Sequence, residues 1–212
     1  ASYAIHRFLQ RQPSGAKFTF CTATDGNHGR AVAWSARHFG HHAVIFMPAG
    51  TVPARIENIR NEGAEVIIHD GTYDQTVART ADEAEKHGWR IISDTAWEGY
   101  TAIPDNIMCG YTTMYREIEE QLASNPLNQN DIIILQAGVG SFPASAAAYF
   151  TYKLGSNCPK IVIVEPTEAA CLHASQKAGR RVAADGTFQT IMAGLNCGTP
   201  SLSAWPILHN HA

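Results

Sequence analysis

The sequence predicts an α/β protein in which parallel sheets are flanked by helices. Six short apolar runs, each bounded by turn-forming residues, are typical of strands. Segments with helical periodicity alternate with them along the chain. The apolar runs are nearly continuous rather than alternating with polar residues, which indicates strands buried on both faces, as in parallel sheets.

The first half of the chain shows this alternation most clearly. The expected elements, in order, are a helix at 1–12, a strand at 18–23, a helix at 30–38, a strand at 43–47, a helix at 53–62, a strand at 65–68, a helix at 72–87 and a strand at 90–93. Ile5, Phe8 and Leu9 share one face of the first helix. Pro53 suits the first turn of the third helical segment, and residues 72–75 fit a capping box.

The second half continues with a long helix at 104–122, then strands at 131–135 and 160–164 around an alanine-rich helix. The segment 124–130 is polar and rich in helix breakers, so it is the expected domain boundary. We therefore predict a four-stranded domain at 1–126 and a second domain at 127–212. From Pro166 onward the pattern is mixed and predicts no clear element.

Composition excludes several classes of protein. The net charge is −3 and no basic stripe is present, which argues against a nucleic-acid partner. No apolar run is long enough for a membrane span, and the N-terminus lacks a signal-peptide layout. Five widely spaced cysteines, with no Cys-x-x-Cys, favour a reducing compartment such as the cytoplasm. Three clustered histidines (His38, His41 and His42) are interpreted as a solvated turn, and no metal site is expected.

The turn from Thr24 to Gly29 is the first candidate binding site. It joins the strand at 18–23 to the following helix, at the edge where open α/β sheets bind ligands. Gly26 and Gly29 allow close approach of a ligand, and Asn27 offers a donor and an acceptor. The competing interpretation is a tight turn without a ligand, since Asp, Gly and Asn are turn formers.

A second glycine loop follows the strand at 131–135. Gly138, Val139, Gly140 and Ser141 stand where backbone N–H groups and a helix dipole form an anion site, so a phosphate is the expected guest. A dinucleotide fold, with Glu165 on the ribose, is one alternative. A packing turn with no ligand is another.

Two further features leave alternatives open. Asp94 ends a strand as Asp25 does, so the two acids could share a cleft, or Asp94 could simply cap a turn. Cys171 and Cys197 could meet in space, although buried free thiols are the expected state.

These motifs together resemble the fold type II pyridoxal-phosphate enzymes, the tryptophan synthase β-like group. Within that group the sequence is similar to the diaminopropionate ammonia-lyases. The resemblance is carried by four blocks, which are residues 24–30, 94–100, 136–140 and 190–195. Most relatives carry Ser where Asp25 stands, so the acid favours this family over the serine and threonine dehydratases.

The resemblance implies a reaction, a cofactor and site residues. The reaction is the α,β-elimination of 2,3-diaminopropionate, a small amino acid, to pyruvate and ammonia, with pyridoxal 5′-phosphate as cofactor. Asp25 is implied as the base for the D-substrate and Asp94 as the base for the L-substrate. Asn27 is implied at the cofactor's 3′ oxygen, and the loop from Gly138 to Ser141 at its phosphate. Members are usually homodimers.

The resemblance also implies that the chain is an internal part of the enzyme. The lysine that carries the cofactor is expected a few residues before Ser2, upstream of Ala1, and the chain as given is expected to be inactive. Residues 1–126 would form the small domain, and 127–212 an incomplete large domain. The remaining alternatives are another fold type II lyase or dehydratase acting on a small hydroxy amino acid, and a non-catalytic nucleotide-binding α/β module.

Overall fold

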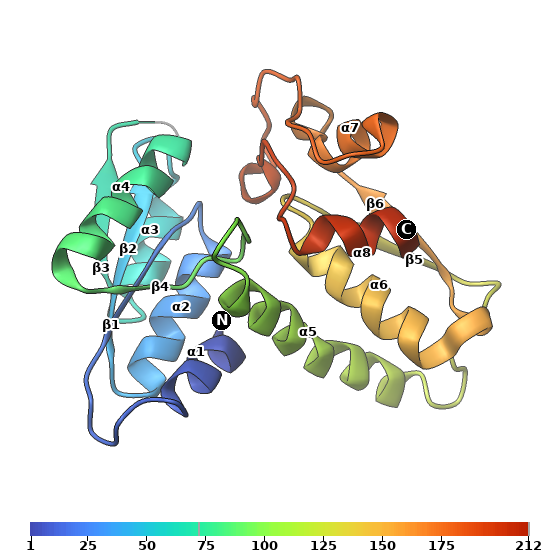
Figure 1. Cartoon of the computed structure of the whole chain (residues 1–212), viewed down its shortest axis with the longest axis horizontal. Helices are drawn as coiled ribbons and strands as arrows, with labels where there is room; N and C mark the ends of the chain where they lie inside the picture. The colour runs from blue at the N-terminus through green and yellow to red at the C-terminus, as the bar shows by residue number, and fades with distance from the viewer. Residues whose placement is uncertain (72, 212) are drawn as a thin grey trace. The chain divides into compact units, whose positions relative to one another are not determined.

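The computed structural model describes residues 1–71 and 73–211. They form two compact units, Ala1–Asp94 and Thr95–Ala212. Every pairing between named strands is parallel, and the strands form a four-stranded and a two-stranded sheet (Figure 1). The α/β class with parallel sheets flanked by helices is confirmed.

The first unit is a four-stranded sheet with the strand order β3-β2-β1-β4. Its strands are β1 (Thr19–Ala23), β2 (His42–Pro48), β3 (Glu65–His69) and β4 (Arg90–Ile91), and its helices are α1 (Ser2–Leu9), α2 (Asn27–His38), α3 (Pro53–Arg60) and α4 (Tyr73–His87). Cys21 pairs with Val44 on one side and with Ile91 on the other. The capping box expected at 72–75 falls on Thr72, which lies outside the described residues.

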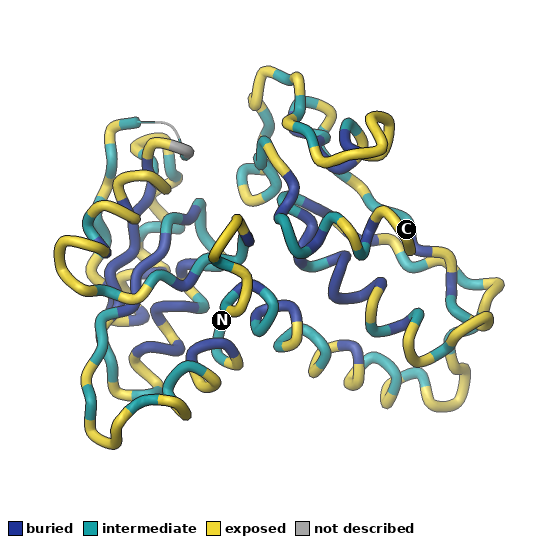
Figure 2. Tube along the Cα trace, in the orientation of Figure 1, coloured by how far each residue is buried: buried dark blue, intermediate teal, exposed yellow. Residues whose placement is uncertain are grey.

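Helices cover both faces of this sheet because its central strands are apolar on both sides. Val44 and Phe46 belong to a buried cluster with Ala84 of α4. Ile45, which points to the opposite face, lies against Gly29 of α2. Figure 2 shows the resulting band of buried residues along β1 and β2. The two-sided burial confirms what the continuous apolar runs predicted.

The second unit is built around helix α6. Its elements are α5 (Ala102–Gln121), β5 (Ile132–Gln136), α6 (Ser141–Leu154), η1 (Gly155–Asn157), β6 (Lys160–Val164), η2 (Thr167–Ala169), α7 (Cys171–Ala178), η3 (Ala193–Leu195) and α8 (Ala204–His211). Helices α5 and α8 pack on α6, and β5 pairs with β6 (Figure 1). The core includes Tyr115, Phe150 and three alanines of α6, with apolar residues of β5, β6, α7 and α8.

The division into units differs from the boundary predicted after residue 126. Helix α5 packs on α6, so the compact second unit begins at Thr95. Tyr115 of α5 donates a hydrogen bond to the Phe142 carbonyl at 3.1 Å, and Glu119 accepts one from Tyr149 at 2.6 Å. The breaker-rich segment at 124–130 is instead a connection between α5 and β5 inside that unit.

Candidate functional site

The turn after β1 is organised by the side chain of Thr24, which is almost fully buried. Its Oγ1 accepts hydrogen bonds from the N–H groups of Gly26 (3.0 Å) and Gly29 (3.2 Å). These bonds satisfy a donor in the first turn of α2, where N–H groups have no partner within the helix. A Cβ on Gly29 would lie 2.2 Å from Thr24 Cγ2, so only glycine permits this packing. Thr24 is not among the residues predicted from the sequence, although Thr hydroxyls are known to form such turns.

Asp25 lies half-buried in this turn. Burial raises the pKa of its carboxyl above the usual value, and the nearby charge of Arg55 opposes that shift. Arg55 Nη1 donates to the Asp25 backbone carbonyl at 3.1 Å. Perturbed carboxyl groups of this kind are common among catalytic bases.

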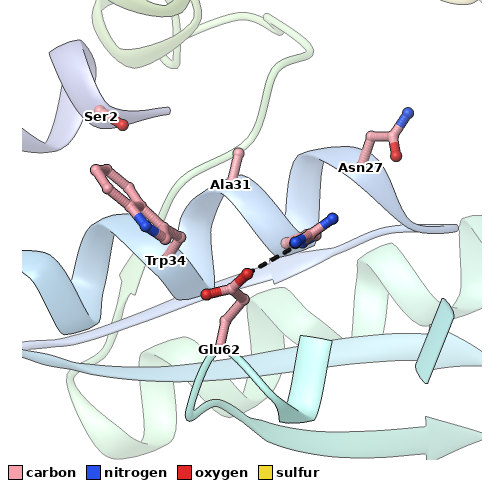
Figure 3. Close-up of a pocket in the computed structure, with 6 residues that line it drawn as sticks. Ser2, Asn27, Ala31, Trp34 and Glu62 are labelled. Atoms are coloured by element: carbon pink, nitrogen blue, oxygen red, sulfur yellow. Dashed lines mark hydrogen bonds and ion pairs between the residues drawn. The ribbon is translucent and has the colours of Figure 1, made fainter. Parts of the chain in front are cut away.

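Asn27 is exposed at the first position of α2. It lines a shallow pocket of about 340 Å³ in the first unit, together with Ser2, Arg30, Ala31, Trp34 and Glu62. Figure 3 shows Asn27 at the end of the pocket away from Trp34. Arg30 Nε donates to Glu62 Oε1 at 3.1 Å, so these two charges compensate each other. Because Asn27 is exposed and lines this pocket, its amide can offer a donor and an acceptor to a polar group.

Asp94 follows β4 and lies beside His28 of α2. His28 Nε2 donates to the Ile92 carbonyl at 2.7 Å, because a carbonyl can only accept. His28 Nδ1 lies 3.8 Å from Asp94 Oδ2. β1 and β4 are parallel neighbours, so Asp25 and Asp94 follow their carboxyl ends at the same edge of the sheet. His28 is not among the residues predicted from the sequence, although its place between Asn27 and Gly29 in the turn motif is a signal for it.

In the second unit, the glycine loop joins β5 to α6. Gly140 has φ +95°, a left-handed conformation that favours glycine, and among the described residues no side chain caps the helix there. A Cβ on Gly138 would lie 2.8 Å from Cys197 Sγ, so this position also needs glycine. Within the described chain, no backbone acceptor is found for the N–H groups of Val139 and Gly140.

This loop fits a phosphate group. Backbone N–H groups such as those of Val139 and Gly140, placed just before a fourteen-residue helix and reinforced by its dipole, are the donors that bind phosphate in many proteins. The sulfur of Cys171 donates to the Gly138 carbonyl at 3.5 Å. Burial raises the pKa of Cys171 to about 12, which keeps the thiol protonated as this contact requires. Cys171 and Cys197 are both free thiols.

Glu165 does not have the position that a ribose-binding acid would need. Its Oε1 accepts from the Leu172 N–H and its Oε2 from the His173 N–H, both at 2.8 Å. Both carboxylate oxygens therefore cap helix α7. This use of Glu165 removes the main support for the dinucleotide-binding alternative.

Other candidate residues are accounted for by packing. His38 stacks on Trp34 with ring centroids 4.8 Å apart, and His41 packs against Phe18 and Phe20. In the part of the chain that the structure describes, no three His, Cys, Asp or Glu side chains are grouped to hold a metal ion. Nor does any described helix have the length and apolarity to cross a membrane.

Comparison with known families matches residues 1–212 to the family described as "Pyridoxal-phosphate dependent enzyme". The chain belongs to this family. Pyridoxal phosphate is the family's cofactor, and a glycine loop at the start of α6 is compatible with binding its phosphate.

Within the family, the chain is similar to diaminopropionate ammonia-lyases. It is 45% identical over 198 residues to the one from Escherichia coli (strain K12), which covers 93% of this chain and 50% of the relative. It is 47% identical over 194 residues to the one from Salmonella typhimurium, covering 91% and 48%. The chain spans about half the length of the curated relatives it matches.

Solved structures of a diaminopropionate ammonia-lyase are also similar to this chain. The crystal structure of holo diaminopropionate ammonia-lyase from Escherichia coli superposes with a TM-score of 0.92 at 41% identity, covering 100% of this chain and 56% of that one. The structure of the same enzyme in complex with D-serine gives a TM-score of 0.91 at 40% identity, covering 100% and 56%.

Proposed function

We propose that this chain is part of an enzyme that converts 2,3-diaminopropionate and water to pyruvate and two molecules of ammonia. The observation that supports this most directly is the pair of acids, Asp25 and Asp94, which follow the carboxyl ends of neighbouring strands. The similarity to diaminopropionate ammonia-lyases over more than nine tenths of the chain supports the same assignment.

The residues of this chain have distinct roles in the proposed reaction. The glycine loop from Gly138 to Ser141 binds the phosphate of pyridoxal phosphate, and Asn27 binds its 3′ oxygen. When bound, this cofactor withdraws electrons from the Cα–H bond of the substrate. Asp25 accepts the Cα proton of the D-enantiomer, and Asp94 accepts it from the L-enantiomer. The β-amino group then leaves as ammonia, and hydrolysis of the remaining enamine gives pyruvate and the second ammonia.

Burial favours the role of Asp25 as a base. A raised pKa makes a carboxylate a stronger base at neutral pH than an ordinary surface Asp. For Asp94, the neighbouring side chain is His28, whose Nδ1 lies 3.8 Å from the carboxylate just after β4. Each acid therefore has its own neighbours, which suits two bases that act separately.

The lysine that carries the cofactor is proposed to precede Ser2 in a longer chain. The lysines at 17, 86, 153, 160 and 177 match no such position in the family's motif. We further propose that the longer protein is a homodimer in the cytoplasm, where its free cysteines remain reduced.

The test is pyruvate release by the full-length protein from D- and L-2,3-diaminopropionate, with Asp25→Asn and Asp94→Asn as variants. Loss of a general base typically costs ~10²–10⁴-fold. Asp25→Asn should act mainly on the D-substrate and Asp94→Asn mainly on the L-substrate, whereas Asp82→Asn, on the exposed face of α4, should change neither. Equal loss of both activities in both variants would contradict the assignment of two bases.

A second candidate is elimination from a small hydroxy amino acid. The Escherichia coli relative has been solved with D-serine, and threonine dehydratases are among the more distant relatives, at 27–34% identity. Assays with D-serine, L-serine and L-threonine beside the diamino acid distinguish the two. A higher kcat/KM for a hydroxy amino acid would favour this candidate.

A further inference from the structure

Ser201, in the second unit, uses all three of its polar groups to bind separate segments of the chain. It is fully buried just before helix α8. Its N–H donates to the Val139 carbonyl in the middle of the glycine loop at 2.8 Å. Its carbonyl accepts from the N–H groups of Ala204 (3.2 Å) and Trp205 (3.1 Å) in the first turn of α8.

The hydroxyl of Ser201 binds a third segment. Its Oγ accepts a hydrogen bond from the Ala96 N–H at 2.9 Å, across 105 positions of sequence. The Ala96 carbonyl in turn accepts from the Leu202 N–H at 3.0 Å. The Ala96 peptide groups are thus held on both sides by two consecutive residues. Because Ala96 is itself almost fully buried, water cannot replace the hydroxyl without rearrangement.

Ala96 stands two positions after Asp94 in the sequence. Two residues of extended chain span about 7 Å at most, so fixing the Ala96 peptide also restricts the backbone of Asp94. Small displacements of a catalytic group can cost as much as ~10²-fold in rate. The buried Ser201 hydroxyl can therefore influence the position of Asp94, because it binds the peptide of Ala96, two residues after that acid.

We propose that Ser201 is a positioning residue: its hydroxyl fixes the chain that carries Asp94, while its backbone N–H fixes Val139 of the glycine loop. This inference rests on the proposed function for its effect on catalysis. The two links are chemically separate, since Ser201→Ala removes the hydroxyl and keeps the backbone N–H. The side-chain link can therefore be tested without removing the backbone bond to the glycine loop.

The first measurement is hydrogen exchange of the backbone amides in the full-length protein, followed by mass spectrometry of the segment 95–100. Ser201→Ala should speed exchange in this segment. Ser201→Cys, which keeps the volume but offers a weaker acceptor, should have a similar though smaller effect. Ser175→Ala is the matched control. Ser175, in helix α7, is also fully buried and accepts from a backbone N–H, that of Val182 beyond the end of the helix, at 3.0 Å. Ser175→Ala should leave the segment unchanged.

The second measurement is pyruvate release from the two enantiomers. In Ser201→Ala, kcat for L-2,3-diaminopropionate should fall about ten- to a hundredfold more than kcat for the D-enantiomer. Ser175→Ala should preserve the ratio of the two rates.

The outcomes separate this proposal from the proposed function. If the unmodified protein converts neither enantiomer, the proposed function fails, and the exchange measurement still decides whether Ser201 fixes the segment. Unchanged exchange in Ser201→Ala would overturn the inference. Faster exchange with an equal loss of both activities would overturn the link from Ser201 to Asp94.

Discussion

His28 Nδ1 lies 3.8 Å from Asp94 Oδ2, while the opposite ring nitrogen donates to the Ile92 carbonyl at 2.7 Å. One imidazole at the start of α2 therefore contacts the backbone just after β4 and the acid two residues further on. The side chain is mostly buried, with 13% of its surface exposed. This arrangement links the turn that carries Asp25 to the segment that carries Asp94.

We expect His28→Ala to lower the free energy of unfolding by ~1–3 kcal/mol, because the Ile92 carbonyl loses its donor. Under the proposed function, activity on the L-substrate should fall more than activity on the D-substrate. Urea denaturation and pyruvate assays measure the two effects. His38→Ala, which removes an exposed ring stacked on Trp34, is the control. If His28→Ala were as stable as His38→Ala, the hydrogen bond from His28 to Ile92 would contribute little to the free energy of unfolding.

Gly29 is expected to tolerate no side chain. A Cβ there would lie 2.2 Å from Thr24 Cγ2 and 2.9 Å from Ile45 Cγ2, both in the packed interior. Gly29→Ala should therefore destabilise the protein by ~1–3 kcal/mol, the usual cost of overpacking. Gly50→Ala, whose added Cβ meets nothing within 4 Å, should change stability little. Thermal unfolding of both variants checks the prediction, and similar melting temperatures for the two would contradict it.

The contact between Gly138 and Cys197 is expected to support the phosphate site. Gly138→Ala places a Cβ 2.8 Å from Cys197 Sγ, so either the loop or the cysteine side chain must shift. A cost of ~1–3 kcal/mol corresponds to about a five- to 150-fold loss in affinity for pyridoxal phosphate. Adding Cys197→Ala removes the sulfur and should restore most of the affinity.

Cofactor titration of the full-length protein compares the two single variants with the double variant. Cys197→Ala alone is the control and should bind nearly as the unmodified protein does. If the double variant binds no better than Gly138→Ala, steric pressure from Cys197 is not the cause of the loss.

Asp25 is expected to lower stability at neutral pH. Its pKa in the folded state is raised above the ordinary 3.8 by burial, with Arg55 opposing. An acid with a raised folded pKa stabilises the fold only in its protonated form, and this contribution is lost as the pH rises from 3.8 through the folded pKa. Asp25→Asn removes the buried charge.

The variant should therefore unfold at higher urea than the unmodified protein at neutral pH, and the difference should vanish below pH 3.8. Asp82→Asn, at an exposed position, serves as the control. A destabilised Asp25→Asn at neutral pH would mean that the carboxylate makes favourable contacts that outweigh its burial.

The sequence by itself determined the strands, the class of fold and the two glycine turns. Runs such as Ala43–Met47 can be buried only on both faces of a sheet, and the glycines of the two turns mark places where the backbone needs close packing or a positive φ. These signals are local, since each depends on residues within a few positions of one another. Local signals also favour a domain boundary at the breaker-rich segment 124–130. The start of the second unit at Thr95 depends instead on the packing of α5 on α6, which is not a local property of the sequence.

Tertiary structure alone decided which polar groups satisfy one another. The sequence alone is compatible with Glu165 as a ribose ligand, whereas in the structure its two carboxylate oxygens cap α7. The bond from His28 to Ile92 spans 64 positions, and that from Ala96 to Ser201 spans 105. A histidine or a serine has the same donors and acceptors in any context, so its partner follows only from which strand ends and loops the packed core brings within 3 Å or so of each other.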